Sequence, residues 1–301
     1  MSRETEKVMK QLTKYLDEHQ DEITGDDDMQ RLVERFMSEH NSSLQPGNVT
    51  RLPETADDYL ALAEETGAKK KKLEYVKKAL ELEPDNLDAA LMNAELTAKH
   101  PEELLTTLPA LIEKGTEQMK AGGYFQEDMG DFWGVIETRP YMRLRRYYMD
   151  TLVWNNMMKK ACAEGEELLR LCTNDNLGVR YALMHLYAYL EEEQAALALH
   201  KKYGGYEETQ MLLPLAVLYY KLGDLDRSMS YLRRLYKVNP ETKRFLVAAA
   251  ADNLEEYADQ ADPNGYYPGS MSELLYEFMA YAYLFDPLDS FFDWSRRTLK
   301  K

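Results

Sequence analysis

The sequence lacks any apolar segment long enough for a membrane-spanning helix. No apolar run approaches about 18 residues, and the first twenty residues are charged, without the apolar stretch of a secretory signal. Only two cysteines occur in 301 residues, Cys162 and Cys172. Their separation favours two small buried side chains over a disulfide or a metal pair. We therefore expect a cytoplasmic protein without a membrane partner.

The sequence also lacks the common catalytic and cofactor motifs. No His-Glu-x-x-His, Gly-x-x-x-x-Gly-Lys, Gly-x-Gly-x-x-Gly or Gly-x-Ser-x-Gly pattern occurs. The five histidines are scattered along the chain. We predict no catalytic residue, no metal site and no cofactor. The net charge of −16 argues against nucleic acid as a partner, because phosphate binding needs a basic face.

What the sequence has in quantity is helical periodicity, and one pattern recurs at a period of about 34 residues. Its clearest copies are residues 59–84 and 215–240, each with small residues near the expected helix crossing and a proline at its end. Less regular copies are expected at 87–120, 142–175 and 176–208. Repeats that stack only on their neighbours form a solenoid, so we expect about five helix hairpins in one.

These repeats resemble the tetratricopeptide repeat superfamily. Small residues at Ala61 and Ala79, turn glycines at Gly67 and Gly223, and Pro240 after the last repeat carry the resemblance. Four stretches are also similar to a group of bacterial proteins of this kind with no assigned activity: 125–134, 137–143, 174–180 and 266–270. The resemblance implies an all-α fold, a right-handed superhelical solenoid of helix hairpins, and protein binding. At Gly223 we expect the left-handed backbone that a helix end favours.

The chain is expected to have five segments. Residues 1–52 form an N-terminal helical arm or cap, 53–120 hold repeats 1 and 2, 121–140 are an insertion rich in glycine and aromatics, 141–242 hold repeats 3 to 5, and 243–301 form a C-terminal helical cap. Within this cap we expect helices at 243–258, 270–285 and 288–299. The insertion either packs Phe125, Phe132 and Trp133 against the repeats or gates a groove.

A basic cluster interrupts this acidic sequence. Residues 139–160 contain six basic side chains against the single acid Asp150, a net charge of +5. Four of the six are arginines: Arg139, Arg143, Arg145 and Arg146. Arginine pairs bidentately with carboxylates. The cluster therefore either neutralises acids elsewhere in the same chain or binds an acidic segment of a partner, with phosphate ligands or RNA as a lesser alternative.

The resemblance also implies where a ligand would bind, because the first helix of each hairpin lines the concave face in this architecture. The predicted peptide-binding groove consists of Arg143, Arg146, Tyr147, Asp150, Trp154, Arg180, Tyr181, His185, Tyr189, Gln210, Leu213, Val217 and Tyr220. Tyrosine suits such a surface because it offers apolar area with a polar tip. His185 is either a satisfied histidine or a ligand contact.

We predict a non-catalytic scaffold or adaptor that binds a protein or peptide segment, an acidic one in the case of the arginine cluster. One alternative is an enzyme or accessory subunit with a small-molecule site in the groove, which a buried, desolvated His185 beside a carboxylate in a closed pocket would favour. Another is a structural protein that self-associates through an apolar patch around Phe291, Phe292 and Trp294. The sequence leaves homo-oligomers open.

Overall fold

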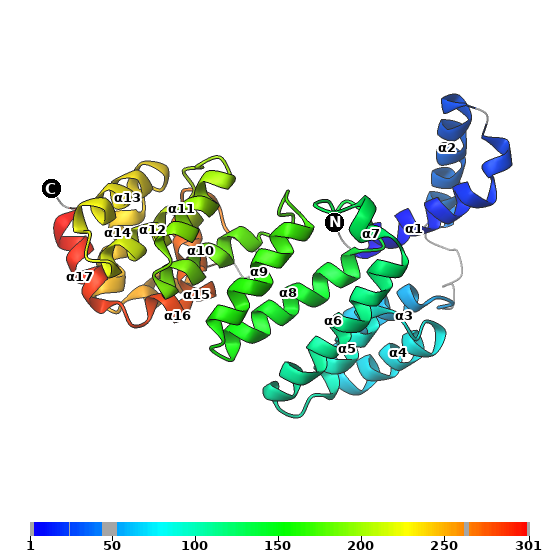
Figure 1. The fold of residues 1–301 in the computed structure, drawn as a ribbon, viewed down its shortest axis with the longest axis horizontal. Helices are drawn as coiled ribbons and strands as arrows, with labels where there is room; N and C mark the ends of the chain where they lie inside the picture. The colour runs from blue at the N-terminus through cyan, green and yellow to red at the C-terminus, as the bar shows by residue number, and fades with distance from the viewer. Residues whose placement is uncertain (1–2, 24, 44–52, 262–264, 300–301) are drawn as a thin grey trace. The chain divides into compact units, whose positions relative to one another are not determined.

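A computed structural model describes residues 3–23, 25–43, 53–261 and 265–299 (Figure 1). All regular secondary structure in these ranges is helical, and no β-strand occurs within them. Among the same residues, no helix is both long and apolar enough to cross a membrane. The chain divides into two compact units, Met1–Arg145 and Arg146–Lys301, and the boundary falls within one helix. The prediction of an all-α fold is confirmed.

Unit 1 consists of an N-terminal helix pair, two further pairs and the start of a long helix. Its helices are α1 (Arg3–Glu18), α2 (Asp26–Ser43), α3 (Ala56–Glu65), α4 (Lys69–Leu82), α5 (Leu87–Thr97), α6 (Leu104–Ala121), α7 (Tyr124–Glu127) and the first part of α8 (Arg139–Trp154), with 3-10 turns η1 (Gln20–Glu22) and η2 (Pro101–Glu103). From α3 to α6 each helix packs on the next, and α1 packs on α2 and α3. Residues 44–52, which belong to the predicted arm, lie outside the described residues.

Small residues allow the helices of unit 1 to approach closely. Ala56, Ala79 and Ala89 are fully buried in one cluster with Leu60. Gly115 on α6 has the same role, because a Cβ atom there would lie 2.7 Å from the ring of Tyr141. The segment predicted as an insertion also packs inward. Its Phe132 is fully buried, and its ring lies against the rings of Phe125 and Tyr141.

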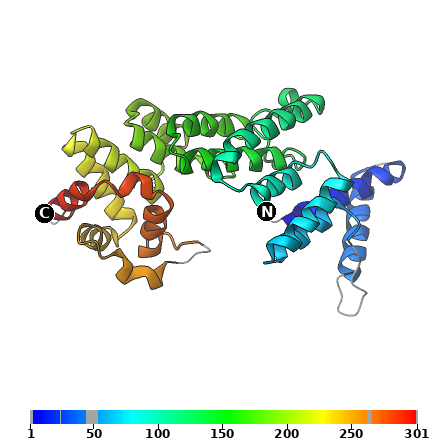
Figure 2. The ribbon, with the colours of Figure 1, turned by 90° about the horizontal axis from the view of Figure 1, so that it is seen from below.

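Unit 2 contains the rest of α8 and all later helices. They are α9 (Met158–Leu171), α10 (Val179–Leu190), α11 (Glu193–Lys202), α12 (Thr209–Lys221), α13 (Leu225–Val238), α14 (Thr242–Ala250), α15 (Met271–Ala280), α16 (Ala282–Phe285) and α17 (Asp289–Thr298), with the 3-10 helix η3 (Leu254–Gln260). Each helix from α9 to α13 packs on its successor, and α10 also packs on α12. The last three helices then turn back, α15 onto α12 and α14, α16 onto α10, and α17 onto α13 and α14 (Figure 2).

Several local predictions for unit 2 are confirmed. Gly223 adopts a left-handed backbone with φ of 79° between α12 and α13. Cys162 and Cys172 are buried free thiols, and burial raises the pKa of the Cys162 thiol to about 12. Gly165 marks a close crossing that the sequence analysis missed, since a Cβ atom there would lie 2.9 Å from Leu183.

Two predicted helix boundaries were wrong. The helix predicted over 243–258 ends at Ala250, and Asp252 takes a left-handed φ of 55° before η3 begins. The helix predicted over 270–285 breaks at Tyr281, whose ring stacks on His185 with centroids 3.7 Å apart. The break coincides with this tertiary contact, and helical periodicity in the sequence does not predict it. Helix α8 begins at Arg139, so its first two residues belong to the segment 121–140.

Candidate functional site

Unit 1 contains a buried charge network shared by three helices. Glu6 on α1 accepts hydrogen bonds from the Nη1 atoms of Arg139 and Arg143 on α8, at 3.3 and 2.9 Å. Arg143 also donates through Nε and Nη2 to the two carboxylate oxygens of Asp88 on α5, at 2.9 and 2.6 Å. Glu6, Arg139 and Asp88 are 4%, 5% and 6% exposed. The network thus brings one carboxylate of α1 against two arginines of the basic cluster.

Both arginines are oriented by residues outside α1. Arg139 donates its Nε to the carbonyl of Trp133 at 2.8 Å, and its guanidinium lies over the Trp133 ring. Arg143 is held bidentately by Asp88, a geometry that fixes the guanidinium plane. Burial alone would lower the pKa of Arg143, but the hydrogen bonds and charges of Asp88 and Glu6 raise it above its ordinary value. Two oriented cations therefore face the position of the Glu6 carboxylate.

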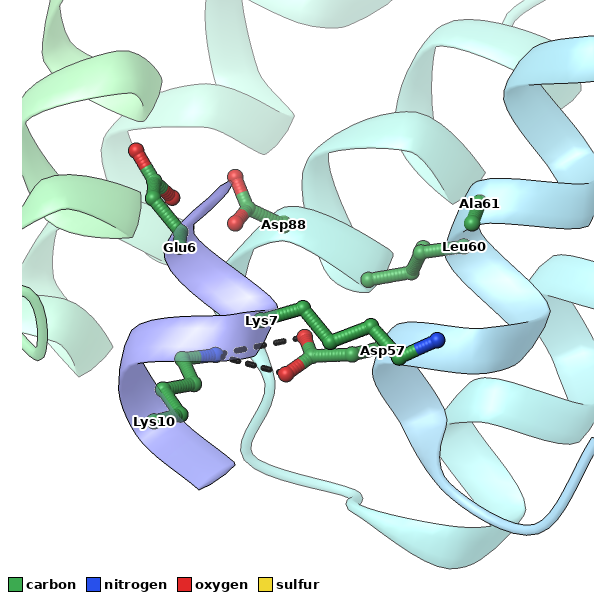
Figure 3. A pocket seen from close by; sticks show the side chains of 7 residues that line it. All are labelled: Glu6, Lys7, Lys10, Asp57, Leu60, Ala61 and Asp88. Atoms are coloured by element: carbon green, nitrogen blue, oxygen red, sulfur yellow. Dashed lines mark hydrogen bonds and ion pairs between the residues drawn. The ribbon is translucent and has the colours of Figure 1, made fainter. Parts of the chain in front are cut away.

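Two lysines of α1 pair with two acids at the start of α3. The Nζ atom of Lys7 lies 2.6 Å from Asp58, and Lys10 donates to both oxygens of Asp57 at 2.9 and 3.2 Å (Figure 3). Asp58 is also the third helical residue of a capping box closed by Thr55. Burial opposes ionisation of Asp58, but Lys7 and the backbone amides at this cap lower its pKa far below the usual range. Asp58 therefore remains a fixed negative charge at neutral pH.

A cavity of about 20 Å³ lies between α1 and the body of unit 1. It is lined by the side chains drawn in Figure 3: Glu6, Lys7, Lys10, Asp57, Leu60, Ala61 and Asp88. This volume accommodates about one water molecule, whereas small-molecule sites typically measure about 300 Å³ or more. The chemistry available here is charge pairing between a helix and a surface.

The opposite side of α1 packs on α2. The rings of Tyr15 and Phe36 lie 5.5 Å apart, and Arg35 donates a hydrogen bond to the Tyr15 hydroxyl. Leu32 and Phe36 of α2 are buried. Helix α1 therefore turns an apolar side to α2 and a charged side to α3, α5 and α8.

In unit 2, the C-terminal helices cover residues that the sequence placed in an open groove. The ring of Tyr189 lies 5.6 Å from that of Tyr283, and the ring of Tyr220 lies 5.3 Å from those of Phe291 and Trp294. Leu213 and Val217, predicted to line the groove, are fully buried. Phe291 and Phe292, the predicted centre of an apolar surface patch, are also buried. Phe291 and Phe292 therefore lie in the core of unit 2, and the other aromatic side chains of this region are half-buried.

His185 lies in this covered region beside a carboxylate. Its Nδ1 atom lies 2.8 Å from the carbonyl oxygen of Tyr181, which can only accept, so Nδ1 carries a proton. Its Nε2 atom lies 3.2 Å from Glu277 on α15, and the two side chains are 0% and 1% exposed. Burial raises the pKa of Glu277, although His185 opposes this shift. A buried, desolvated histidine beside a carboxylate is the feature expected of the enzymatic alternative, and both side chains are closed off from solvent.

Glu273 fixes α15 to the body of unit 2. Its carboxylate accepts hydrogen bonds from Thr209 at 2.7 Å, Asn239 at 3.0 Å and the Gly269 amide at 2.9 Å. Gln210, a predicted groove residue, donates to the same carboxylate at 3.3 Å and to the Tyr266 hydroxyl. A buried carboxylate with this many donors is stabilised without a counter-charge.

The remaining predicted groove residues also contact residues of unit 2. Arg146 pairs with Asp150 at 3.1 Å and donates to the Leu177 carbonyl. Arg180 pairs with Asp175 at 2.9 Å, and Tyr181 donates to Glu208 at 3.0 Å. Tyr147 lies edge-on to Trp154, whose side chain is 69% exposed. Of the thirteen predicted residues, Arg143 belongs to unit 1 and the others to unit 2.

No local sequence pattern indicates which acids pair with the basic cluster. The separation of Glu6 from Arg143 is 137 residues, so no local pattern connects them. Helical periodicity could have placed Glu6, Lys7 and Lys10 on one side of the first helix. It could not have identified the face that this side contacts.

Other kinds of site receive no support from the described residues. Within them, no group of three or more histidine, cysteine, aspartate or glutamate residues could hold a metal ion. No protein-family model matches the chain, and no curated protein matches it either. The charged face beneath α1 is therefore the candidate functional site, on the strength of its geometry.

Proposed function

We propose that this protein is a non-catalytic adaptor that binds a helical segment of a partner protein. The binding surface is the face formed by α3, α5 and the first part of α8, which we call the clamp face. In this proposal the hairpins of each unit are of the tetratricopeptide type and stack as a right-handed superhelix. The two free cysteines are consistent with a cytoplasmic location.

One observation carries the proposal. Arg139 and Arg143 are held by Trp133 and Asp88 so that both guanidinium groups meet one carboxylate on a separate helix. Oriented and largely buried arginines of this kind recognise a carboxylate with defined geometry. The contact resembles recognition of a helix by a protein surface. This contact supports a partner helix that presents a carboxylate to Arg139 and Arg143.

The structure supports the enzymatic and the self-association alternatives less well. His185 and Glu277 are fully enclosed, so an enzymatic role would need unit 2 to open before a substrate could reach them. Self-association through Phe291 and Phe292 would likewise need buried side chains to become exposed. Binding on the clamp face requires displacement of α1 together with α2, which packs on it.

Capture of partners from the native cell extract, read by mass spectrometry, tests the proposal. Glu6→Arg should repel α1 from the two arginines and increase partner capture, whereas Arg143→Glu should abolish it. Lys70→Glu is the matched control, because Lys70 is exposed on α4 and carries the same change of charge away from the clamp face. Equal capture by the wild type and the Arg143→Glu variant, with helicity unchanged, would refute the proposal.

A further inference from the structure

We infer that the clamp face is a receptor for an amphipathic helix with the pattern Glu-Lys-x-x-Lys, and that α1 is its resident, exchangeable occupant. The inference rests on the proposed function and specifies the chemistry of the partner. In α1 the pattern is formed by Glu6, Lys7 and Lys10. The partner is a protein helix that presents the same three charges and replaces α1.

The three charges fit one side of a helix. At about 100° per residue, positions i, i+1 and i+4 lie within an arc of about 100°. Each meets a residue of opposite charge on a different part of the clamp face, with Glu6 at Arg139 and Arg143, Lys7 at Asp58 and Lys10 at Asp57. Figure 3 shows Glu6 near Asp88 and the two lysines on the side of α3. The face thus reads both the signs and the spacing of the charges.

This arrangement also selects against other helices. A lysine in place of Glu6 would put a third cation beside Arg139 and Arg143, and an acid in place of Lys10 would face Asp57. Opposed like charges reject wrong partners more effectively than matched charges increase affinity. A uniformly acidic segment would satisfy the arginines but would be repelled by Asp57 and Asp58. The partner predicted here therefore carries both signs of charge, in contrast to the acidic segment considered from the sequence.

The contacts of α1 suit exchange. Its pairs with α3 are partly open to solvent, since the side chains of Lys10 and Asp57 are 36% and 28% exposed. Exposed ion pairs contribute little to stability, and a buried pair such as Glu6 with Arg139 must offset the desolvation of both charges. When α1 leaves, the arginines regain water, so no charge is left buried without a partner. The main obstacle to a competing helix is that α1 is tethered to the same chain and therefore has a high effective concentration at the clamp face.

The test is binding of a fluorescein-labelled peptide of residues 3–43, which spans α1 and α2, to the full-length chain. Fluorescence anisotropy should show binding to the Glu6→Arg chain, whose own α1 no longer fits, and weaker binding to the wild-type chain. A peptide carrying Glu6→Arg, and the Arg143→Glu form of the receptor, should each weaken binding by at least about tenfold. A peptide with Glu18→Arg is the matched control, because Glu18 is an exposed residue of α1 and should bind as the unmodified peptide does.

Three outcomes would overturn the inference. If the peptide binds neither chain while partner capture still depends on Arg143, the face binds a partner of other chemistry and the proposed function survives. If both peptide binding and partner capture fail, the proposed function falls as well. If sedimentation shows that the wild-type chain dimerises by exchange of α1, a second copy is the occupant and not a partner helix.

Discussion

The two units each use one end of the chain to cover the first helices of their hairpins, but with different chemistry. In unit 1, α1 meets α3, α5 and α8 through Glu6, Lys7 and Lys10, all in ion pairs. In unit 2, α15 to α17 meet α10 and α12 through stacked and buried rings, among them Tyr281 on His185 and Phe291 on Tyr220.

This difference indicates which terminal helices another helix could replace. Burial of a large apolar side chain stabilises by about 1.5–3 kcal/mol each, and the C-terminal helices bury several: Met271, Leu274, Leu275, Leu284, Phe285, Phe291 and Phe292. The free energy that an ion pair gains on contact is largely offset by the hydration that its two charges lose, so separation of the pair costs little. We therefore expect the C-terminal helices to be part of the permanent core and α1 to be removable.

The largest effect is expected from Phe285→Ala in unit 2. Phe285 is 1% exposed and packs against His185, Phe278 and Phe292. Truncation should lower the free energy of unfolding by about 3–5 kcal/mol, measured by urea unfolding followed by circular dichroism. Tyr236→Ala is the control, since Tyr236 is 38% exposed, and should cost less than about 1 kcal/mol. Similar costs for the two variants would mean that the C-terminal helices are not part of the core.

The next largest effect is the pH dependence of stability that Glu277 on α15 causes. Burial raises the folded-state pKa of Glu277 above its unfolded value, so its contribution to stability is full below the usual glutamate range and is lost as the pH rises. Glu277→Gln removes this titration. The urea midpoint of the wild type should therefore fall relative to that of the variant between about pH 4 and pH 7. A constant difference between the two midpoints would show that Glu277 does not titrate abnormally.

A smaller effect is expected at two turn glycines that occupy the same position in different units. Gly223 has a left-handed backbone, and a Cβ atom at Gly223 or at Gly67 would meet nothing within 4 Å. Gly223→Ala should therefore cost about 1 kcal/mol through backbone strain. Gly67, which lacks a left-handed φ, should tolerate alanine or gain about 0.5 kcal/mol in the same urea assay. Equal responses would contradict the difference between the two turns.

The smallest effect on stability is expected from Glu6→Ala. Although Glu6 is 4% exposed, its loss should change the free energy of unfolding of unit 1 by less than about 1 kcal/mol, because α1 can separate and expose the arginines to water. If α1 were a fixed part of the core, the same change would strand two buried cations and cost about 3–5 kcal/mol. Chemical denaturation of this variant beside Glu18→Ala separates the two cases.

The helix hairpins could be predicted from the sequence because the information is local. Apolar spacing, the turn at Gly223 and the proline after α13 each act within a few residues. The breaks at Ala250 and Tyr281 could not, since Tyr281 is held by a stacking contact with His185 almost a hundred residues earlier in the chain. Local periodicity predicts a helix at such a position, and tertiary packing then overrides it.

The candidate site was predictable only in part. The excess of positive charge around Arg143 was visible in the sequence, and pairing within the chain was one of the interpretations considered. The acids that complete the site lie on α1, α3 and α5. They are far from the arginines along the chain, so neither residue spacing nor composition indicates that they pair. The covering of His185 and Tyr220 by the C-terminal helices was hidden in the same way.

Hydrogen exchange of α1 and α15 at two salt concentrations tests the central claim most directly. Between about 0.1 M and about 1 M sodium chloride the Debye length falls from about 10 Å to about 3 Å. The partly exposed pairs of Lys7 and Lys10 with α3 are then screened, whereas apolar contacts stay in place. We predict that amides of α1 exchange faster at high salt while those of α15 do not change. Equal protection of both helices at both salt concentrations would contradict the account.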